Sequence, residues 1–249
     1  MKSKLSARRI FIAQAQIHGS SVIFTSENVR NLTKVLRLKP GDQIVALDGA
    51  RRYNLILEKN PHSELVGKIL SCDLETTPFP LTLGLAFGCV RPGPTEEIIR
   101  HCTELGVSHF FPLLLEYSNR RPANARPRWL NIAASACAQS NRPVMPQIDE
   151  PLEIDLFLER LLPGSTLVYL SPEGDSPPLF QVLQAKLGDR ITLLIGAEGG
   201  LTSREEALVI NAGFVAASLG AATLRTETAA IVSVGISMNW GLILKKSGV

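Results

Sequence analysis

From Leu81 onward the 249-residue chain alternates between strand-like and helix-like segments, and this alternation limits the possible folds more than any other feature. The strand-like runs are short and apolar, and they cover residues 81–87, 107–115, 165–171, 190–196 and 214–220. Helices are expected between and after them, from near Pro94 to Leu105, over residues 128–140, after Pro178, from Thr202 and from Thr226. Strands that alternate with helices predict an α/β domain with a mostly parallel sheet. Periodicity does not give the order of the strands in that sheet.

The start of the chain shows a different pattern, mainly of short β-strands. Ile, Val and aromatic residues are concentrated in five segments, which are residues 8–14, 21–25, 42–48, 52–59 and 64–70. Ser26 is a suitable N-cap for a single helix over residues 27–38. Residues 73–81, with two prolines and two threonines, are typical of a linker. We therefore expect a small barrel-like module over residues 1–74 and a second domain over residues 75–249.

Basic residues are concentrated in the first module. Residues 1–73 contain 12 Lys or Arg against 6 Asp or Glu, whereas the whole chain carries a net charge of only +3. A compact basic region suits a polyanionic partner, of which nucleic acid is the obvious one. A chance bias in a solvated surface would give the same count, so charge alone does not decide between the two.

The cysteines and histidines show no metal-binding pattern. Cys72, Cys89, Cys102 and Cys137 have no C-x-x-C spacing, and no histidine clusters with them. This argues against a metal site or a disulfide framework and favours a reducing, cytoplasmic environment. We find no apolar run of the ~20 residues that a membrane span needs, and no signal-peptide pattern at the start, so we expect no membrane association.

The segment LLIGAEGG (193–200) places three glycines and one acidic residue at the end of an expected strand. It fits neither the phosphate-binding P-loop, which needs a lysine after its last glycine, nor the G-x-G-x-x-G dinucleotide fingerprint. Glu198 within the loop also disfavours a phosphate group, because like charges repel. The loop fits a neutral or cationic ligand contacted by main-chain groups, or else a tight connection that binds nothing. Thr202 and Glu205 make a T-x-x-E capping box that starts the next helix.

A second loop, SLGAATLRTETAA (218–230), also follows an expected strand. It runs from Gly220 through small residues to Leu224 and Arg225, and Thr226 is a natural N-cap for the last helix. If the strands that end near residues 171, 196 and 220 are parallel neighbours, their three loops share one edge of the sheet. Open α/β sheets bind ligands at that edge, so three such loops are a more specific sign of a pocket than one.

These two loops, together with residues 32–49, 102–118 and 128–148, resemble the RsmE family of SPOUT-superfamily methyltransferases. The resemblance covers most of the chain. It implies an N-terminal PUA-like RNA-binding β-barrel and a C-terminal trefoil-knotted α/β domain that binds S-adenosyl-L-methionine. It also implies a homodimer that methylates N3 of a uridine in 16S ribosomal RNA, as free RNA or in the small ribosomal subunit. The alternatives are a SPOUT methyltransferase for another RNA site and a non-catalytic RNA-binding ribosome assembly factor.

The loops and the resemblance together indicate the residues of the cofactor pocket. They are expected at Leu170, Ser171, Ile195, Gly196, Ala197, Glu198, Gly199, Gly200, Ser218, Leu219, Gly220 and Leu224. For catalysis we expect Arg225 to hold the uracil oxygens or a phosphate as charge develops. Glu198 would accept a proton or a hydrogen bond, or orient Arg225. The alternatives are a structural ion pair of Arg225 with Glu227 or Glu198, and a role for Glu198 in bracing the loop.

Basic and amide side chains indicate where RNA would bind. The candidates are Arg8, Arg9, Lys34, Arg37, Arg120, Arg121, Gln139 and Arg142. The chain departs from the family pattern mainly among the residues expected to contact RNA or the target nucleotide. His101 stands where lysine is usual, residues 86–97 lack the lysine often found before the helix that follows, and residues 113–123 follow the family's acid–Arg–Ser pattern only loosely. Ala197 replaces a common proline, which is a mild change.

The last helix, from Thr226, is apolar on nearly every face through Trp240 and Leu244. Such a helix must be buried all round. It is expected either wholly in the core or with one side in the core and the other in a dimer interface, and the family resemblance favours the second arrangement.

Overall fold

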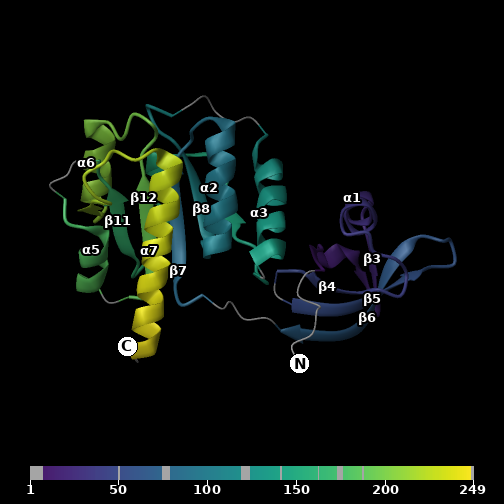
Figure 1. Ribbon diagram of the computed structural model, residues 1–249. Coiled ribbons are helices and arrows are strands. Elements are labelled where there is room, and N and C mark those ends of the chain that lie inside the picture. Colours follow the sequence, from purple (N-terminus) through teal and green to yellow (C-terminus); the bar gives the residue numbers. More distant parts are fainter. Residues whose placement is uncertain are drawn as a thin grey trace. The chain divides into compact units, whose positions relative to one another are not determined.

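The computed structural model describes residues 8–49, 51–74, 79–118, 124–140, 142–161, 163–172, 176–186 and 188–247. The chain divides into two compact units, each with a sheet of its own (Figure 1). The first unit comprises Met1–Pro78 and Ala134–Met145. The second comprises Phe79–Ala133 and Pro146–Val249.

The first unit contains a six-stranded, mostly antiparallel sheet in the order β1-β4-β5-β6-β3-β2. Its strands are β1 (Arg9–Phe11), β2 (Ile17–His18), β3 (Ser21–Ile23), β4 (Gln43–Leu47), β5 (Arg51–Lys59) and β6 (Leu65–Leu74). The five expected strands are present, and β2 is an additional one. The strand order is that of an open sheet, and no pairing among the described residues closes it into a barrel.

The core of this unit follows from the alternation of side chains along β5. Tyr53, Leu55 and Leu57 are buried, whereas the residues between them are partly exposed. This is the pattern of a strand whose successive side chains point to opposite faces. Leu32, from the helical segment, is fully buried against the same cluster. One apolar face of the sheet and one helical segment therefore form the core.

The helix of the first unit begins one residue earlier than the sequence predicts. The N-cap is Thr25 and not Ser26, because Thr25 Oγ1 accepts a hydrogen bond from the Asn28 N–H at 3.2 Å and Asn28 Oδ1 accepts one from the Thr25 N–H at 3.3 Å. Asn28 replaces the usual Glu or Gln of a capping box, which hides the signal in the sequence. The helix α1 (Ser26–Arg30) then continues as a π-helical turn, η3 (Asn31–Val35).

The second unit is an α/β domain, as the alternation predicts. All its strand pairs are parallel, in the order β10-β8-β7-β12-β11-β13, with β9 on β8. The strands are β7 (Thr82–Gly88), β8 (His109–Leu114), β9 (Gln147–Ile148), β10 (Leu152–Glu153), β11 (Thr166–Leu170), β12 (Arg190–Ile195) and β13 (Val215–Ala217). The helices are α2 (Pro92–Leu105), α3 (Arg126–Ser140), α4 (Ile154–Leu158), α5 (Leu179–Ala185), α6 (Ser203–Asn211) and α7 (Thr226–Ser247). The residues of α3 from Ala134 onward belong to the first unit.

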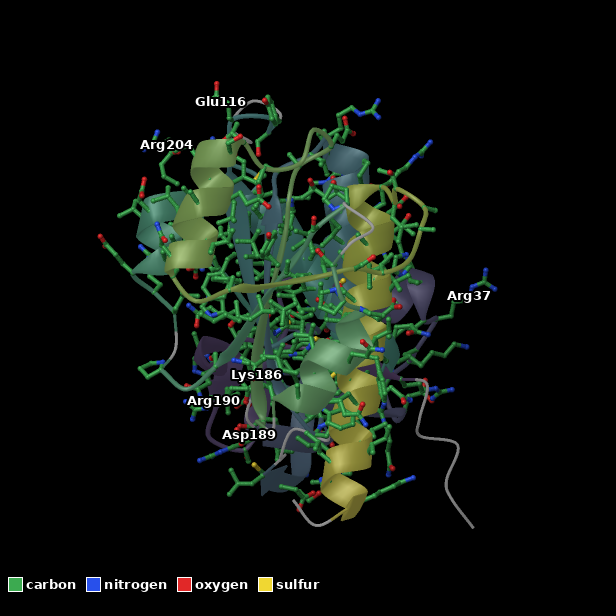
Figure 2. The ribbon with its side chains drawn as sticks, turned by 90° about the vertical axis from the view of Figure 1, so that its left-hand side faces the viewer. Arg37, Glu116, Lys186, Asp189, Arg190 and Arg204 are labelled. Carbon is green, nitrogen blue, oxygen red and sulfur yellow. The ribbon has the colours of Figure 1, made fainter. Side chains whose placement is uncertain are left out.

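Helices cover both faces of this parallel sheet (Figures 1 and 2). On one face α4 packs against α6 and β8, with Phe111, Phe157 and Phe214 in the shared core. On the other face α7 packs against α2, α5, β7 and β12. Because both faces of the sheet are buried, the sequences of its central strands are continuously apolar. The sequence does not predict β9, β10 or α4, because elements of two to five residues are too short to show a period.

The last helix, α7, combines an apolar composition with a length of 22 residues. Residues Thr226–Lys246 are long and apolar enough to cross a membrane, judged by length and composition alone. The expectation that no segment has this character is therefore wrong. The contacts of α7 with β7, β12, α2 and α5 are those of a core helix, which accounts for the same composition.

The two ends of the parallel sheet carry different groups. Figure 2 shows Glu116, which follows β8, and Arg204, at the start of α6, at one end of the unit. Lys186, Asp189 and Arg190, which precede or begin β12, lie at the opposite end. The first end holds the carboxyl ends of the strands, where the sequence places the glycine loops.

Gly106, the residue that ends α2, gives a test of this fold. Its φ of +113° is a left-handed conformation, and a Cβ built there would lie 2.5 Å from Cδ1 of Phe79. We expect Gly106→Ala to lower the free energy of unfolding by about 1–3 kcal/mol because of backbone strain and this clash. Gly93→Ala is the control, since a Cβ on Gly93 meets no atom within 4 Å. Equal urea midpoints for the two variants would contradict the account.

Candidate functional site

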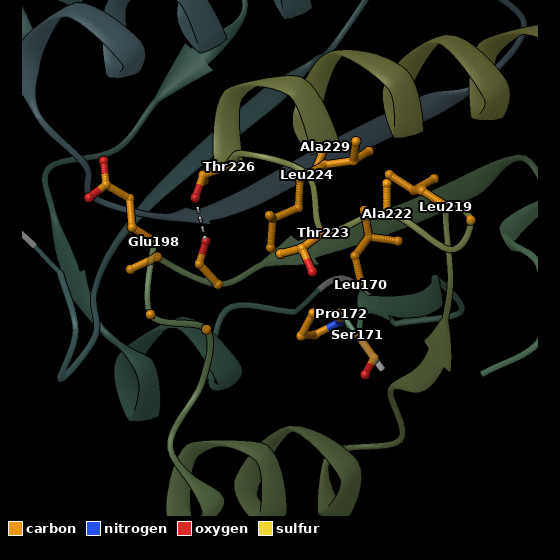
Figure 3. A pocket seen from close by; sticks show the side chains of 16 residues that line it. Leu170, Ser171, Pro172, Glu198, Leu219, Ala222, Thr223, Leu224, Thr226 and Ala229 are labelled. Carbon is orange, nitrogen blue, oxygen red and sulfur yellow. Dashed lines mark hydrogen bonds between the residues drawn. The ribbon is translucent and has the colours of Figure 1, made fainter. Parts of the chain in front are cut away.

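A cavity of about 240 Å³ lies at the carboxyl ends of β11, β12 and β13 (Figure 3). These three strands are parallel neighbours, so the loops that follow them share one edge of the sheet, as the sequence predicts. Side chains and main chain of these loops and of the first turns of α7 line it. The lining residues are Leu170, Ser171, Pro172, Ile195, Gly196, Ala197, Glu198, Gly199, Gly200, Leu219, Gly220, Ala222, Thr223, Leu224, Thr226 and Ala229.

All the residues predicted for the cofactor pocket line this cavity except Ser218. The Ser218 side chain is buried, and its hydroxyl accepts a hydrogen bond from the Gly220 N–H at 3.1 Å and donates one to the Gly220 carbonyl at 3.2 Å. Ser218 therefore stabilises the loop that follows β13 without lining the cavity. Gly220 itself has a φ of +130°, which few residues other than glycine adopt.

The glycines of the loop that follows β12 are required by the chain's own packing. A Cβ on Gly196 would lie 2.8 Å from the carbonyl carbon of Gly200, and a Cβ on Gly199 would lie 2.9 Å from Cβ of Tyr117. Gly200 has a φ of +77°, and its N–H donates to the Ala197 carbonyl at 2.9 Å. The close approach of a ligand to these glycines, expected from the sequence, stays a prediction. The geometry gives each glycine an internal reason as well.

The loop is tied to the last helix by one buried hydrogen bond. The Thr226 hydroxyl donates to the Gly196 carbonyl at 3.2 Å, and Thr226 is only 4% exposed (Figure 3). Thr226 is the first residue of α7, and the Arg225 carbonyl accepts the N–H of Ala229 at 2.9 Å. The prediction that Thr226 is the N-cap is therefore wrong by one residue. Its hydroxyl forms a hydrogen bond with the Gly196 carbonyl in the pocket wall and does not cap the helix.

The next helix starts as predicted. Thr202 is the N-cap of α6, Thr202 Oγ1 accepts from the Glu205 N–H at 3.2 Å, and Glu205 Oε2 accepts from the Thr202 N–H at 2.8 Å. Glu205 is buried, and its second oxygen accepts a hydrogen bond from the N–H of Glu116 at 2.9 Å. The capping box therefore also fixes the segment that follows β8.

Glu198, at the rim of the pocket, faces a cation that the sequence analysis did not single out. Arg91 Nη2 lies 3.5 Å from Glu198 Oε1, and both side chains are more than half exposed. Arg91 directly precedes α2 and follows β7, a central strand of the same sheet. Arg91 could have been identified from the sequence, because it is a cation just after the carboxyl end of a strand, in a segment without a lysine.

Arg225 is exposed at the start of α7, beside Leu224 of the pocket lining. Within the described part of the chain it forms no ion pair with Glu198 or Glu227, so the alternative of a structural ion pair is not found there. Nor does Glu198 orient Arg225, since its ionic partner is Arg91. The Arg225 guanidinium is therefore available to an external group.

Cys89, at the end of β7, is buried, which raises its pKa to about 12 and keeps it a neutral thiol.

The described RNA-binding candidates all fall in the first unit, although they come from two stretches of sequence. They are Arg8, Arg9, Lys34, Arg37, Gln139 and Arg142. Figure 2 shows Arg37 pointing away from the chain. Arg8 pairs with Asp42 at 2.9 Å, and a main-chain hydrogen bond from Lys39, with the Arg8 guanidinium, lowers the pKa of Asp42. Arg120 and Arg121 lie outside the described residues.

Arg142 does not fit the expected role of a surface phosphate contact. Its side chain is 3% exposed, and its Nε donates to the Val144 carbonyl at 2.7 Å. Burial lowers the pKa of this guanidinium. Gln139, one turn earlier, is exposed. Arg142 therefore supports the chain around it, and the motif match did not distinguish a buried arginine from an exposed one.

The pocket contains further residues that the sequence analysis missed. Pro172, Ala222, Thr223 and Ala229 all line it. They lie between or next to residues that were selected, and their small size gave no chemical signal. The described residues contain no group of three or more His, Cys, Asp or Glu side chains placed to hold a metal ion.

Comparison with known proteins defines the class. The family model for RNA methyltransferase domains matches residues 77–238, which include every strand and loop of the pocket. A parallel α/β unit with a pocket at its strand ends, matched in this way, is an RNA methyltransferase domain.

The particular family follows from individual relatives. Ribosomal RNA small subunit methyltransferase E of Synechocystis sp. is 34% identical over 93% of this chain and 77% of its own length. The protein of that name from Buchnera aphidicola subsp. Schizaphis graminum is 30% identical over 91% of this chain and 93% of its own. The chain belongs to the ribosomal RNA small subunit methyltransferase E family, RsmE. A member from Neisseria gonorrhoeae, solved bound to S-adenosyl methionine, is 26% identical with a TM-score of 0.82 over 93% of this chain and 97% of the other.

The Thr226 hydroxyl gives a test of how the pocket is held. We expect Thr226→Val to lower the free energy of unfolding by about 1 kcal/mol, because it keeps the shape of the side chain and leaves the Gly196 carbonyl without its hydrogen bond. Thr228→Val is the matched control, since Thr228 is exposed on the same helix. Urea denaturation measures both. A Thr226→Val curve that overlays the control would rule out this hydrogen bond as a support of the loop.

Proposed function

We propose that this chain is an S-adenosyl-L-methionine-dependent methyltransferase that methylates N3 of a uridine in 16S ribosomal RNA. The observation that carries the proposal is the three-loop pocket at the carboxyl ends of β11, β12 and β13 in a chain of this family. The Neisseria gonorrhoeae relative, which binds S-adenosyl methionine, supports the identity of the cofactor.

The residues of the pocket fit this cofactor. S-adenosyl-L-methionine supplies an electrophilic methyl group on a cationic sulfonium and carries no phosphate. Leu170, Ile195, Leu219 and Leu224 offer apolar walls, and the main chain of the glycine loops offers donors and acceptors for an adenine edge. Glu198 brings a carboxylate to the same cavity. An acidic loop without a lysine suits a cation better than a phosphate.

The target base must lose a proton before it can accept a methyl group at N3. The N3–H of uracil ionises only well above neutral pH, so the enzyme must stabilise the negative charge that then spreads over the ring oxygens. Arg225 is exposed beside the pocket, and we assign it this role or that of holding a neighbouring phosphate. Glu198 is our candidate for accepting the proton or a hydrogen bond, with Arg91 next to it.

The first unit is the proposed RNA-binding part. We assign residues 1–74 to a PUA-like β-barrel module and residues 75–249 to the SPOUT methyltransferase domain with its trefoil knot. The basic candidates Arg8, Arg9, Lys34 and Arg37 in this unit support RNA contact, and so does exposed Gln139. Phosphate contacts of this kind position the substrate and carry little sequence information.

We also propose a cytoplasmic homodimer. On α7 the side chains of Val232, Leu242 and Ile243 are 38%, 47% and 42% exposed, and on the adjoining α5 Phe180 is 43% exposed. Several exposed apolar side chains on two packed helices suit a protein interface. The partner would be a second copy of this chain, and we propose no role for a metal or a membrane.

Two other functions fit parts of the same structure. A SPOUT methyltransferase that modifies another RNA site would use the same pocket, since it would use the same methyl donor. A non-catalytic assembly factor would bind RNA through the first unit and transfer no methyl group. Free Arg225 beside an intact pocket favours an enzyme over the second alternative.

The experiment is methylation in vitro of 16S ribosomal RNA and small subunits from cells that lack the gene, followed by mass-spectrometric mapping of the methylated nucleotide. We expect N3-methyluridine with the wild-type protein. Arg225→Ala should lower the rate by about 10²-fold, because it removes the charge that stabilises the uracil anion. Calorimetric affinity for S-adenosyl-L-methionine should stay the same.

Arg190→Ala is the matched control, since Arg190 is exposed at the opposite end of the sheet. This variant should methylate at the wild-type rate. Methyl transfer to a different base would point to another RNA site, and no transfer at all would favour the assembly factor. Wild-type turnover by Arg225→Ala would refute the role of that residue alone.

A further inference from the structure

Tyr117 is an exposed aromatic side chain beside the pocket that the reaction outlined above does not use. It follows β8, a parallel strand whose carboxyl end lies at the same edge of the sheet as the pocket. The residue is 54% exposed. It therefore lies at the rim of the pocket with much of its surface open to solvent.

The turn that carries Tyr117 is held in place by hydrogen bonds on both sides of it. The Ser118 hydroxyl accepts from the Leu115 N–H at 3.0 Å and donates to the Leu113 carbonyl at 3.2 Å. The Glu116 N–H donates to the buried Glu205 carboxylate at 2.9 Å. Tyr117 therefore lies between two anchored residues, and its backbone position is fixed before any ligand arrives.

One side of Tyr117 lies against the glycine loop. A Cβ on Gly199 would come within 2.9 Å of Cβ and Cγ of Tyr117 and 3.0 Å of its Cδ2. The absence of a side chain at Gly199 thus lets the tyrosine lie directly on the main chain of the pocket. Gly199 is itself part of the pocket lining. The tyrosine is consequently next to the cavity and still more than half open to solvent.

We propose that Tyr117 is the platform on which the target uracil stacks at the mouth of the pocket. This inference rests on the proposed function. A base must leave its helical stack to reach an enclosed active site, and an aromatic face replaces part of the stacking that it loses. Stacking uses the face of the ring and leaves its edge free, so N3 and the neighbouring oxygens stay open to the methyl donor and to Arg225. Tyr117 is thus a positioning residue.

The ring and not the hydroxyl should matter. Within the described chain the structure gives the Tyr117 hydroxyl no hydrogen bond, whereas the ring contacts the loop. Base–aromatic stacking is worth about 1–3 kcal/mol per base, which corresponds to a change in binding between about fivefold and about 140-fold. The effect should fall on the RNA substrate and leave the methyl donor unaffected.

Three substitutions separate stacking from packing. Tyr117→Phe keeps the aromatic face, Tyr117→Leu keeps apolar bulk without it, and Tyr117→Ala removes both. With small subunits as substrate, we expect kcat/KM near the wild-type value for Tyr117→Phe and at least about fivefold lower for the Leu and Ala variants. Melting temperature and calorimetric affinity for S-adenosyl-L-methionine should stay at wild-type values in all three. A Tyr117→Leu variant as active as wild type, or a loss of cofactor affinity in the same variant, would overturn the proposal.

Photocrosslinking gives a second readout that does not depend on turnover. 16S ribosomal RNA transcribed with 5-iodouridine is bound to the full-length protein, irradiated and digested, and the crosslinked peptide is identified by mass spectrometry. We expect a crosslink at Tyr117 that Tyr117→Leu abolishes. A crosslink pattern without Tyr117, from a protein that methylates uridine, would overturn the stacking role and leave the proposed function standing. Wild-type protein without methyl transfer would instead remove the proposed function.

Discussion

The conformation of the segment Ala197–Gly200 is the constraint on which the pocket depends. Gly196 packs against the Gly200 main chain too closely for a Cβ, and the Thr226 hydroxyl holds the Gly196 carbonyl from the start of α7. A Cβ on Gly88, at the end of β7, would likewise lie 2.5 Å from the Ala197 nitrogen. The end of β7 and the start of α7 therefore both contact this loop. The shape of the cavity therefore depends on the conformation of this loop.

The same loop connects the pocket to the surrounding groups of the site. The helix that follows it begins with a capping box, and Glu205 of that box also holds the segment that carries Tyr117. Glu198 of the loop faces Arg91 at the end of the central strand. The pocket wall, the charged pair and the exposed tyrosine are thus parts of one connected assembly on the parallel sheet. Preorganisation of this kind is what positions a substrate for transfer.

The α/β architecture could be predicted from the sequence because strand-like and helix-like segments alternate regularly after Leu81. The two glycine loops indicated the position of the pocket. Finer points were not readable. The caps at Thr25 and Arg225 differ from the predicted ones by one residue. Thr25 and Ser26 are both suitable N-cap residues, and the Thr226 hydroxyl forms a tertiary hydrogen bond with the Gly196 carbonyl. The contact of Gly199 with Tyr117 and the burial of Arg142 depend on segments far apart in sequence or on tertiary packing, so no local pattern could show them.

The central claim is that this loop forms the binding site of the methyl donor, and titration calorimetry tests it most directly. Wild-type protein should bind S-adenosyl-L-methionine saturably. Gly196→Ala, whose Cβ would lie 2.8 Å from the Gly200 main chain, should weaken binding at least about tenfold, while Gly93→Ala, with open space around it, should bind as wild type does. No binding by the wild-type protein, or equal affinity for all three proteins, would contradict the account.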